Sequence, residues 1–211
     1  MDYFIGSMAA AALALFCAVA SLAVNRIMRP GGTKEDDPAD VLFHSAARLK
    51  NLPDSEDIYK AISEEMHKLC GNSHIVMVNS FDKKYDLLTI KAISGIGSLV
   101  QRGTQLIGDD YLRMSFKVGD EENKYLTGGQ LRPVEEGLYR IAMGKIPKEL
   151  CEDVEQFLKI KKVYVIGLYD RGVIFGNVII IPVFGNDIKD KKAVEKAAAL
   201  FASVLFERSG K

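Results

Sequence analysis

Thiol and imidazole side chains are sparse in this sequence, and their spacing limits the chemistry that they could support. The cysteines are Cys17, Cys70 and Cys151, far apart in the chain and without a CxxC pair. This pattern disfavours a disulfide framework or a zinc site and fits a reducing compartment. The histidines are His44, His67 and His74. No two of them have helical or zinc-finger spacing, which disfavours a histidine-built metal site.

Cys151 is the side chain with the clearest chemical potential. It lies near the start of a helix predicted over residues 147–158, and a helix N-terminus stabilises a thiolate. Such a thiol could sense redox state. No CxxCH motif and no axial histidine accompany it, so the residues themselves assign no cofactor.

No arrangement of side chains in the sequence suggests catalysis. There is no nucleophile–base pair and no metal cluster, and the neighbours Glu135 and Glu136 point apart on a predicted helix. Charges balance, with 28 Lys and Arg against 28 Asp and Glu, and no basic–aromatic stripe is present. We therefore expect neither an enzyme nor a nucleic-acid-binding protein.

The chain begins with a long uncharged stretch, Tyr3–Val24, which is rich in Ala, Leu, Val and Phe. As a helix it would cross about 30 Å of hydrocarbon. Asp2 in place of a basic n-region disfavours a cleaved signal peptide, and the bulky Phe16 before the cysteine disfavours a lipoprotein. Because Arg26 and Arg29 follow the span, the positive-inside rule predicts a single-pass cell-membrane anchor with its N-terminus outside.

Three regions follow from this pattern. Residues 1–25 are the predicted transmembrane anchor, residues 26–52 a juxtamembrane linker with a short stalk helix, and residues 53–208 a folded cytoplasmic domain. The linker contains Gly31 and Gly32 and an acidic run. The stalk helix is predicted over 39–49, after Asp37 as N-cap and Pro38 in the first turn.

The stretch VYVIGLYDRGVIFGNVIIIPV, residues 163–183, predicts a central β-hairpin with a three-residue turn at 170–172. In its second strand, period-two alternation places Val173, Phe175, Ile179 and Ile181 on one face and Ile174, Val178 and Ile180 on the other. Both faces are apolar. Something must therefore pack above and below this hairpin.

The remaining elements are expected around this hairpin. Residues 75–81 and 87–94 predict a second antiparallel hairpin, and 116–118 and 124–126 are candidate edge strands. Helices are predicted over 58–70 (with a start signal at 53–55), 134–143, 147–158 and 188–205 (with Asn186 and Asp187 as its cap). His67 is expected on the surface of the first of these helices.

This order of elements resembles a GAF domain over roughly residues 54–207. The resemblance rests on the helix at 58–70, on IVMVNSFD at 75–82, and on VYVIGLYDRGVIFGNVIII with its glycines 167, 172 and 176. GLY at 137–139 and GKIP at 144–147 are similar to a sub-type of archaeal sensory histidine kinases. The resemblance implies an α+β fold with a central antiparallel sheet and helices on both faces. The first and last helices would cover one face, and the middle segment would close over a ligand pocket on the other.

Several branches of that family fit the sequence poorly. Free-methionine sulfoxide reductases need several clustered cysteines, whereas this domain has only Cys70 and Cys151. The NKFDE motif of cyclic-nucleotide-binding members is not recognisable, and no phytochrome-like signature for a bilin surrounds either cysteine. The resemblance therefore implies a non-enzymatic sensory member.

The sequence thus predicts a membrane-anchored module that binds a small ligand or senses redox state. The candidate ligand-binding residues, each of which core packing also explains, are Phe116, Tyr125, Tyr139, Met143, Cys151 and Asn177. Asn177 interrupts an apolar strand, so its amide needs a partner in the covering loop or in a ligand. We expect a homodimer that signals to a separate protein such as a histidine kinase. One alternative is a structural dimerisation or scaffold domain with an occluded pocket. Because some sensory GAF domains hold haem, the resemblance also leaves a haem-binding redox sensor with haem as its cofactor as a second alternative.

Overall fold

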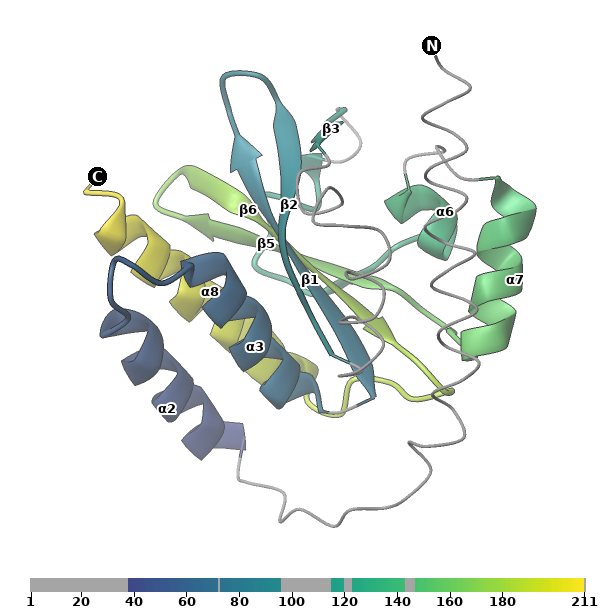
Figure 1. Cartoon of the computed structure of the whole chain (residues 1–211), viewed down its shortest axis with the longest axis horizontal. Coiled ribbons are helices and arrows are strands. Elements are labelled where there is room, and N and C mark those ends of the chain that lie inside the picture. Colours follow the sequence, from purple (N-terminus) through teal and green to yellow (C-terminus); the bar gives the residue numbers. More distant parts are fainter. Residues whose placement is uncertain (1–37, 72, 96–114, 120–122, 143–146, 211) are drawn as a thin grey trace.

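A computed structural model describes residues 38–71, 73–95, 115–119, 123–142 and 147–210. Its strands form one antiparallel sheet in the order β3-β2-β1-β6-β5-β4 (Figure 1). They are β1 (His74–Asp82), β2 (Leu87–Ser94), β3 (Ser115–Lys117), β4 (Arg132–Pro133), β5 (Tyr164–Asp170) and β6 (Val173–Pro182). The predicted α+β class with a central antiparallel sheet is confirmed.

Helices lie on both faces of this sheet (Figure 1). One face carries α2 (Pro38–Lys50), α3 (Ile58–Cys70) and α8 (Lys191–Arg208). The short helix α6 (Gly137–Ile141) and α7 (Lys148–Leu158) lie on the other. The predicted stalk helix is α2, which packs against α3 and α8.

Alternate strand residues supply two hydrophobic cores, because successive side chains of a strand point to opposite faces. The first core joins Val76, Val78, Ile166, Val178 and Ile180 to α3 and α8, with Met66 and Phe201 fully buried. The second core joins Ile75, Val165, Ile179 and Ile181 to Val154 and Leu158 of α7. The prediction that both faces of the central hairpin are covered is confirmed.

Helix starts differ from their predicted positions. The predicted end of α3 is confirmed, but the helix does not start at 53–55. It begins at Ile58 after the N-cap Asp57, whose carboxylate accepts the Tyr59 and Lys60 N–H groups. The cap of α8 is Asp190, which accepts the Ala193 N–H. Asn186 and Asp187 do not cap α8, since their side chains bond elsewhere in the chain.

The edge of the sheet also differs from the prediction. The strand at 116–118 is confirmed as β3, whereas 124–126 forms a turn. Arg132 and Pro133 form β4 instead of leading into a helix, and the Val134 N–H donates to the Val163 carbonyl at 2.8 Å. The helix predicted over 134–143 therefore begins only at Gly137, after Glu136 with a positive φ of 62°.

The central hairpin turns more tightly than predicted. Asp170 pairs with Val173, so the loop has two residues, Arg171 and Gly172, with φ of 47° and 84°. Two left-handed residues match the twist of the flanking strands, and glycine adopts that conformation readily.

A bulge beside Gly176 reverses the alternation in β6. Leu168 pairs with Gly176, but Tyr169 pairs with Ile174, so Phe175 is skipped. Phe175 consequently packs on the first core, and Ile174 packs on a small cluster on the other side that contains Leu126. The predicted faces of Phe175 and Ile174 are therefore wrong, because an extra residue in one strand shifts the period.

A buried carboxylate links α2 to α3. Glu65 accepts a hydrogen bond from the Ser45 hydroxyl at 2.6 Å, and it pairs with Arg48 and, at 2.7 Å, with Lys68. Burial opposes ionisation of Glu65, but the hydrogen bonds from Lys68, Ser45 and Arg48 outweigh it. They hold the pKa of this carboxyl below its ordinary value of 4.5.

This network predicts an acid-sensitive contact between α2 and α3. A lowered folded-state pKa gives stability that is present above pH 4.5 and is lost as the pH falls through the folded-state value. Glu65→Gln should lower the free energy of unfolding at pH 7 by about 1 kcal/mol, because its cationic partners are solvent-exposed. Urea unfolding measures how far the free energy of unfolding falls between pH 7 and pH 3.5. This fall should be smaller for the variant than for wild type. An equal fall in both proteins would contradict the role given to Glu65.

The predicted anchor, Tyr3–Val24, lies outside the described residues. Within the part of the chain that the structure describes, no helix is both long and apolar enough to span a bilayer.

Candidate functional site

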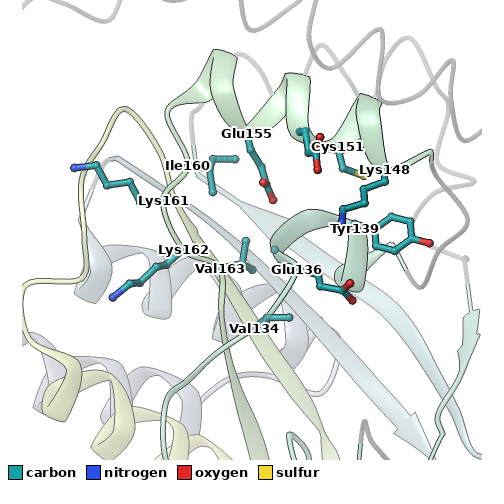
Figure 2. A pocket seen from close by; sticks show the side chains of 12 residues that line it. Val134, Glu136, Tyr139, Lys148, Cys151, Glu155, Ile160, Lys161, Lys162 and Val163 are labelled. Carbon is teal, nitrogen blue, oxygen red and sulfur yellow. The ribbon is translucent and has the colours of Figure 1, made fainter.

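A cavity of about 350 Å³ lies beside the second core, between α6, α7 and the residues leading into β5 (Figure 2). Its lining mixes apolar, aromatic and charged side chains. The lining residues are Val134, Glu136, Gly137, Tyr139, Lys148, Cys151, Glu152, Glu155, Ile160, Lys161, Lys162 and Val163.

The apolar packing of α7 and one half-buried hydrogen bond position the two helices. Cys151, Val154 and Leu158 form the buried face of α7 at helical spacing. Beside that face, the Glu155 carboxylate accepts the Leu138 N–H at 2.6 Å and so fixes α6 against α7. Gly137 has a φ of 52°, and a Cβ there would overlap this carboxylate. A side chain at position 137 would displace the Glu155 carboxylate from the Leu138 N–H.

Charged groups reach the cavity mainly from α7. Figure 2 shows the Glu155 and Lys148 side chains extending from α7 toward α6, whereas Lys161 and Lys162 point away from the cavity. The lining therefore holds the carboxylates of Glu136, Glu152 and Glu155, of which Glu155 is already engaged with the backbone, together with the Lys148 ammonium group and the Tyr139 ring. This combination can orient a small polar molecule.

Cys151 is buried, with 1% of its surface exposed. Burial raises the pKa of its thiol, and the negative charges of Glu155 and Glu152 raise it further. The prediction of a stabilised thiolate at a helix N-terminus is therefore wrong. Two glutamates of the same helix and loss of solvent both disfavour the anion.

A second polar feature lies on the same face of the sheet. Asn79 and Asn177 face each other across β1 and β6, two residues along from Met77 and Ile179 of the second core. They are 4% and 5% exposed, and the Asn79 amide donates to Asn177 Oδ1 at 2.7 Å. The other group of Asn79, Oδ1, is buried without a hydrogen-bond partner in the described structure. A buried acceptor without a partner is unusual in a folded protein.

No protein-family model and no curated protein matches this sequence, whereas solved structures match its fold. The GAF domain of a phosphoenolpyruvate-protein phosphotransferase from Coxiella burnetii superposes with a TM-score of 0.55 at 11% identity. The match covers 84% of this chain and 98% of that one. The fold is that of a GAF domain.

Two phytochrome structures also match the GAF fold of this chain. The phycoerythrobilin-bound GAF domain from a cyanobacterial phytochrome gives a TM-score of 0.50 at 15% identity, over 82% of this chain and 98% of that one. The chromophore-binding domain of Stigmatella aurantiaca bacteriophytochrome gives 0.52 at 14% identity, over 87% of this chain. This chain spans 63% of that domain's length. At these identities the likeness concerns the fold.

The GAF fold brings two of the predicted site residues together. Tyr139 and Cys151 both line the cavity between α6 and α7. Tyr125 packs against the second core, and Phe116 lies on the edge strand β3 opposite Leu88. Asn177 lies on the central strand β6, and Met143 falls outside the described residues.

Haem does not fit the described residues of this GAF cavity. No histidine lines it, and its cysteine is held as a buried thiol. His67, predicted on the surface, is half-buried and packs close to Gly95. No group of three metal-binding side chains occurs among the described residues. We therefore derive no chemistry from haem or a metal.

The sequence prediction does not include two of the candidate functional residues, Glu155 and Asn79. Glu155 follows Cys151 by one helical turn, so the i, i+4 rule applied to Cys151 would have included it. Asn79 interrupts the apolar run IVMVNSF as Asn177 interrupts VIFGNVIII. The sequence does not indicate that the two asparagines pair, since they lie in different hairpins.

Proposed function

We propose that this chain is a non-enzymatic sensory module that binds a small polar molecule in the cavity between α6 and α7. The supporting observation is the convergence of Tyr139, Cys151, Lys148 and Glu155 around one cavity on the face of the GAF fold opposite α2, α3 and α8. Two matching structures, a phycoerythrobilin-bound GAF domain and a chromophore-binding domain, carry small molecules by name. A cavity of about 350 Å³ suits a ligand of modest size.

The chemistry of the cavity favours binding over catalysis and over redox sensing. Its one thiol is protonated and buried, and no described lining residue is a histidine that could act as a general base. Glu155 already accepts a backbone hydrogen bond. The module therefore reports ligand occupancy by a change in the packing of α6 on α7.

A thermal-shift screen of small metabolites against the full chain tests this proposal. Compounds that raise the melting temperature of wild type should bind Tyr139→Ala at least tenfold more weakly, because that variant removes one wall of the cavity. Tyr85→Ala is the matched control, since Tyr85 is an exposed tyrosine in the turn between β1 and β2. Hits that bind both variants as tightly as wild type would contradict a site in this cavity.

We also propose that Tyr3–Val24 anchors the module in the cell membrane, with the GAF domain in the cytoplasm. The support is the uncharged length of this stretch and the arginines that follow it. The module would then act on a separate signalling protein, for which a histidine kinase is the candidate that the sequence resemblance suggests.

A homodimer through α2 is the third part of the proposal. Phe43 on α2 is 72% exposed, which is unusual for a large apolar side chain and suggests a partner surface. A membrane anchor raises the local concentration of a second copy, and homodimers are the commonest oligomers.

Oxidative crosslinking of the full chain in membranes tests the dimer. In a Cys17→Ser background, Phe43→Cys should form a disulfide-linked dimer, whereas Tyr85→Cys on the distant β1–β2 turn should not. The native Cys70 and Cys151 are buried and free, so they should contribute little. Equal crosslinking of the two variants, or none, would contradict dimerisation through α2.

A further inference from the structure

One end of the domain gathers several chain segments that are far apart in the sequence. The Val183 N–H donates to the Ser73 carbonyl, and the Gly185 N–H donates to the Lys159 carbonyl, each at 3.0 Å. These bonds place the start of β1, the connection from α7 to β5 and the loop after β6 side by side (Figure 1).

Exposed lysines concentrate at this end. We name the set Lys159, Lys161, Lys162, Lys189 and Lys192 the basic end. Lys161 lies against Gly185, so the two lysine-bearing loops are in contact. No described acidic side chain pairs with Lys159, Lys161, Lys162 or Lys192.

The acidic side chains of the same region are fewer than the lysines. Asp187 accepts the Tyr164 hydroxyl at 2.8 Å and pairs with Lys191 at 3.3 Å. Asp190 caps α8. Segments 159–162 and 185–192 thus hold the basic end and Lys191 against two carboxylates, so their net charge is positive.

The opposite end of the domain has no such surplus. There Arg208 pairs with Asp54 at 2.8 Å, Lys50 with Glu207 at 3.9 Å, and Arg171 with Asp170 at 3.7 Å. The charge of the domain is thus polarised along the sheet.

The chain before α2 enters at the basic end. The last residue of α2, Lys50, reaches Glu207 near the end of α8, so the first residue, Pro38, lies toward the start of α8 (Figure 1). Residues 25–37 separate Pro38 from the uncharged stretch Tyr3–Val24. A random-coil chain of that length has a mean end-to-end distance of roughly 20 Å. Anchoring of Tyr3–Val24 would therefore hold the basic end near the bilayer surface.

We propose that the basic end docks on the anionic phospholipid headgroups of the membrane that holds the anchor, which rests on the anchoring proposed above. Lysines on flexible stems suit headgroup phosphates, and attraction within a Debye length of about 8 Å orients the domain. The acidic linker residues Glu35–Asp37 lead into α2. The 159–162 lysines follow α7 on the opposite face of the sheet from α2, so that linker is a poorer occupant of this part of the basic end.

Lysine footprinting of the full chain in lipid nanodiscs tests the docking. Discs of phosphatidylcholine alone are compared with discs containing phosphatidylglycerol, and acylation of each lysine is followed by mass spectrometry. In anionic discs, acylation at the basic end should slow at least threefold. It should recover in 1 M salt, while Lys83 and Lys84 on the β1–β2 turn stay unchanged.

Charge reversal distinguishes docking from a general effect of the bilayer. Lys159→Glu with Lys161→Glu and Lys162→Glu should restore fast acylation of Lys192, whereas Lys60→Glu with Lys83→Glu and Lys84→Glu should not. A chain that fails to enter either disc disproves the anchor. In that case, the acylation rates of the basic-end lysines are measured with added vesicles of the two lipid compositions, and slowing by anionic vesicles alone would still support the docking.

Three results would overturn the docking proposal. One is equal acylation of the basic end in neutral and anionic bilayers. A second is slowing by added single-stranded DNA without slowing by anionic lipid, which would assign the surface to nucleic acid. The third is slow acylation in neutral discs that becomes fast when Glu35, Asp36 and Asp37 are neutralised, which would show that the linker covers the basic end.

Discussion

Gly176→Ala is expected to lower the free energy of unfolding by about 3 kcal/mol. Gly176 has a φ of 152°, and a Cβ there would overlap the backbone carbonyl of Asn79 and crowd Cα of Ser80. These obstacles are backbone atoms of the paired strand β1, so relief would require β1 and β6 to separate. Urea unfolding followed by circular dichroism measures the loss.

Gly129→Ala is the matched control. Gly129 is exposed and has no atom within 4 Å of an added Cβ, so its stability should change by less than about 0.5 kcal/mol. A Gly176→Ala variant as stable as Gly129→Ala would show that β6 does not approach β1 as closely as described.

Asn177→Leu is expected to destabilise the domain by about 2 kcal/mol. The substitution removes the acceptor of the Asn79 amide and leaves Asn79 buried with neither of its polar groups paired. The melting temperature of the full chain should fall accordingly. An unchanged melting temperature would mean that Asn177 is exposed or that the pair is not formed.

The double variant Asn79→Leu with Asn177→Leu supplies the control. It leaves no polar side chain of the pair in the sheet. Its loss in free energy of unfolding should therefore be about 1 kcal/mol smaller than the sum of the losses of the two single variants. Strictly additive losses would contradict a direct bond between the two side chains. Loss of ligand response in Asn79→Leu would add the unpaired Asn79 oxygen to the binding site.

The sequence predicted those elements whose pattern is local. The helix at 58–70 and the strand pairs formed by 75–81 with 87–94 and by the two halves of 163–183 follow from periodicity and from turn residues. The two covered faces of the hairpin follow from the absence of polar alternation. Each of these inferences needs only neighbouring residues in the chain.

Non-local contacts explain the errors. The sides of the sheet on which Phe175 and Ile174 lie depend on a bulge that forms where Gly176 meets Asn79, a residue of the strand β1. The helix predicted over 134–143 is shorter in the structure because Arg132 and Pro133 pair with β5. Helical propensity was overridden by strand pairing, which a single sequence does not reveal.

The candidate site was predicted only in part for the same reason. Residue type alone points to Tyr139 and Cys151, and the fold places both at one cavity. The helix terminus predicts a lowered pKa for the Cys151 thiol, but burial and the nearby glutamates raise it instead. The pairing of Asn79 with Asn177 depends on the antiparallel register of β1 and β6.

Competitive dialysis against a small-molecule extract tests the central claim, ligand binding in the cavity between α6 and α7, most directly. Wild type, the cavity-filling variant Cys151→Phe and the control Tyr85→Ala are dialysed together, and the retained compounds are identified by mass spectrometry. Circular dichroism confirms that each variant is folded. The account predicts a compound that wild type and Tyr85→Ala retain at least tenfold more than Cys151→Phe does. Retention of the same compounds at the same levels by all three folded proteins would contradict it.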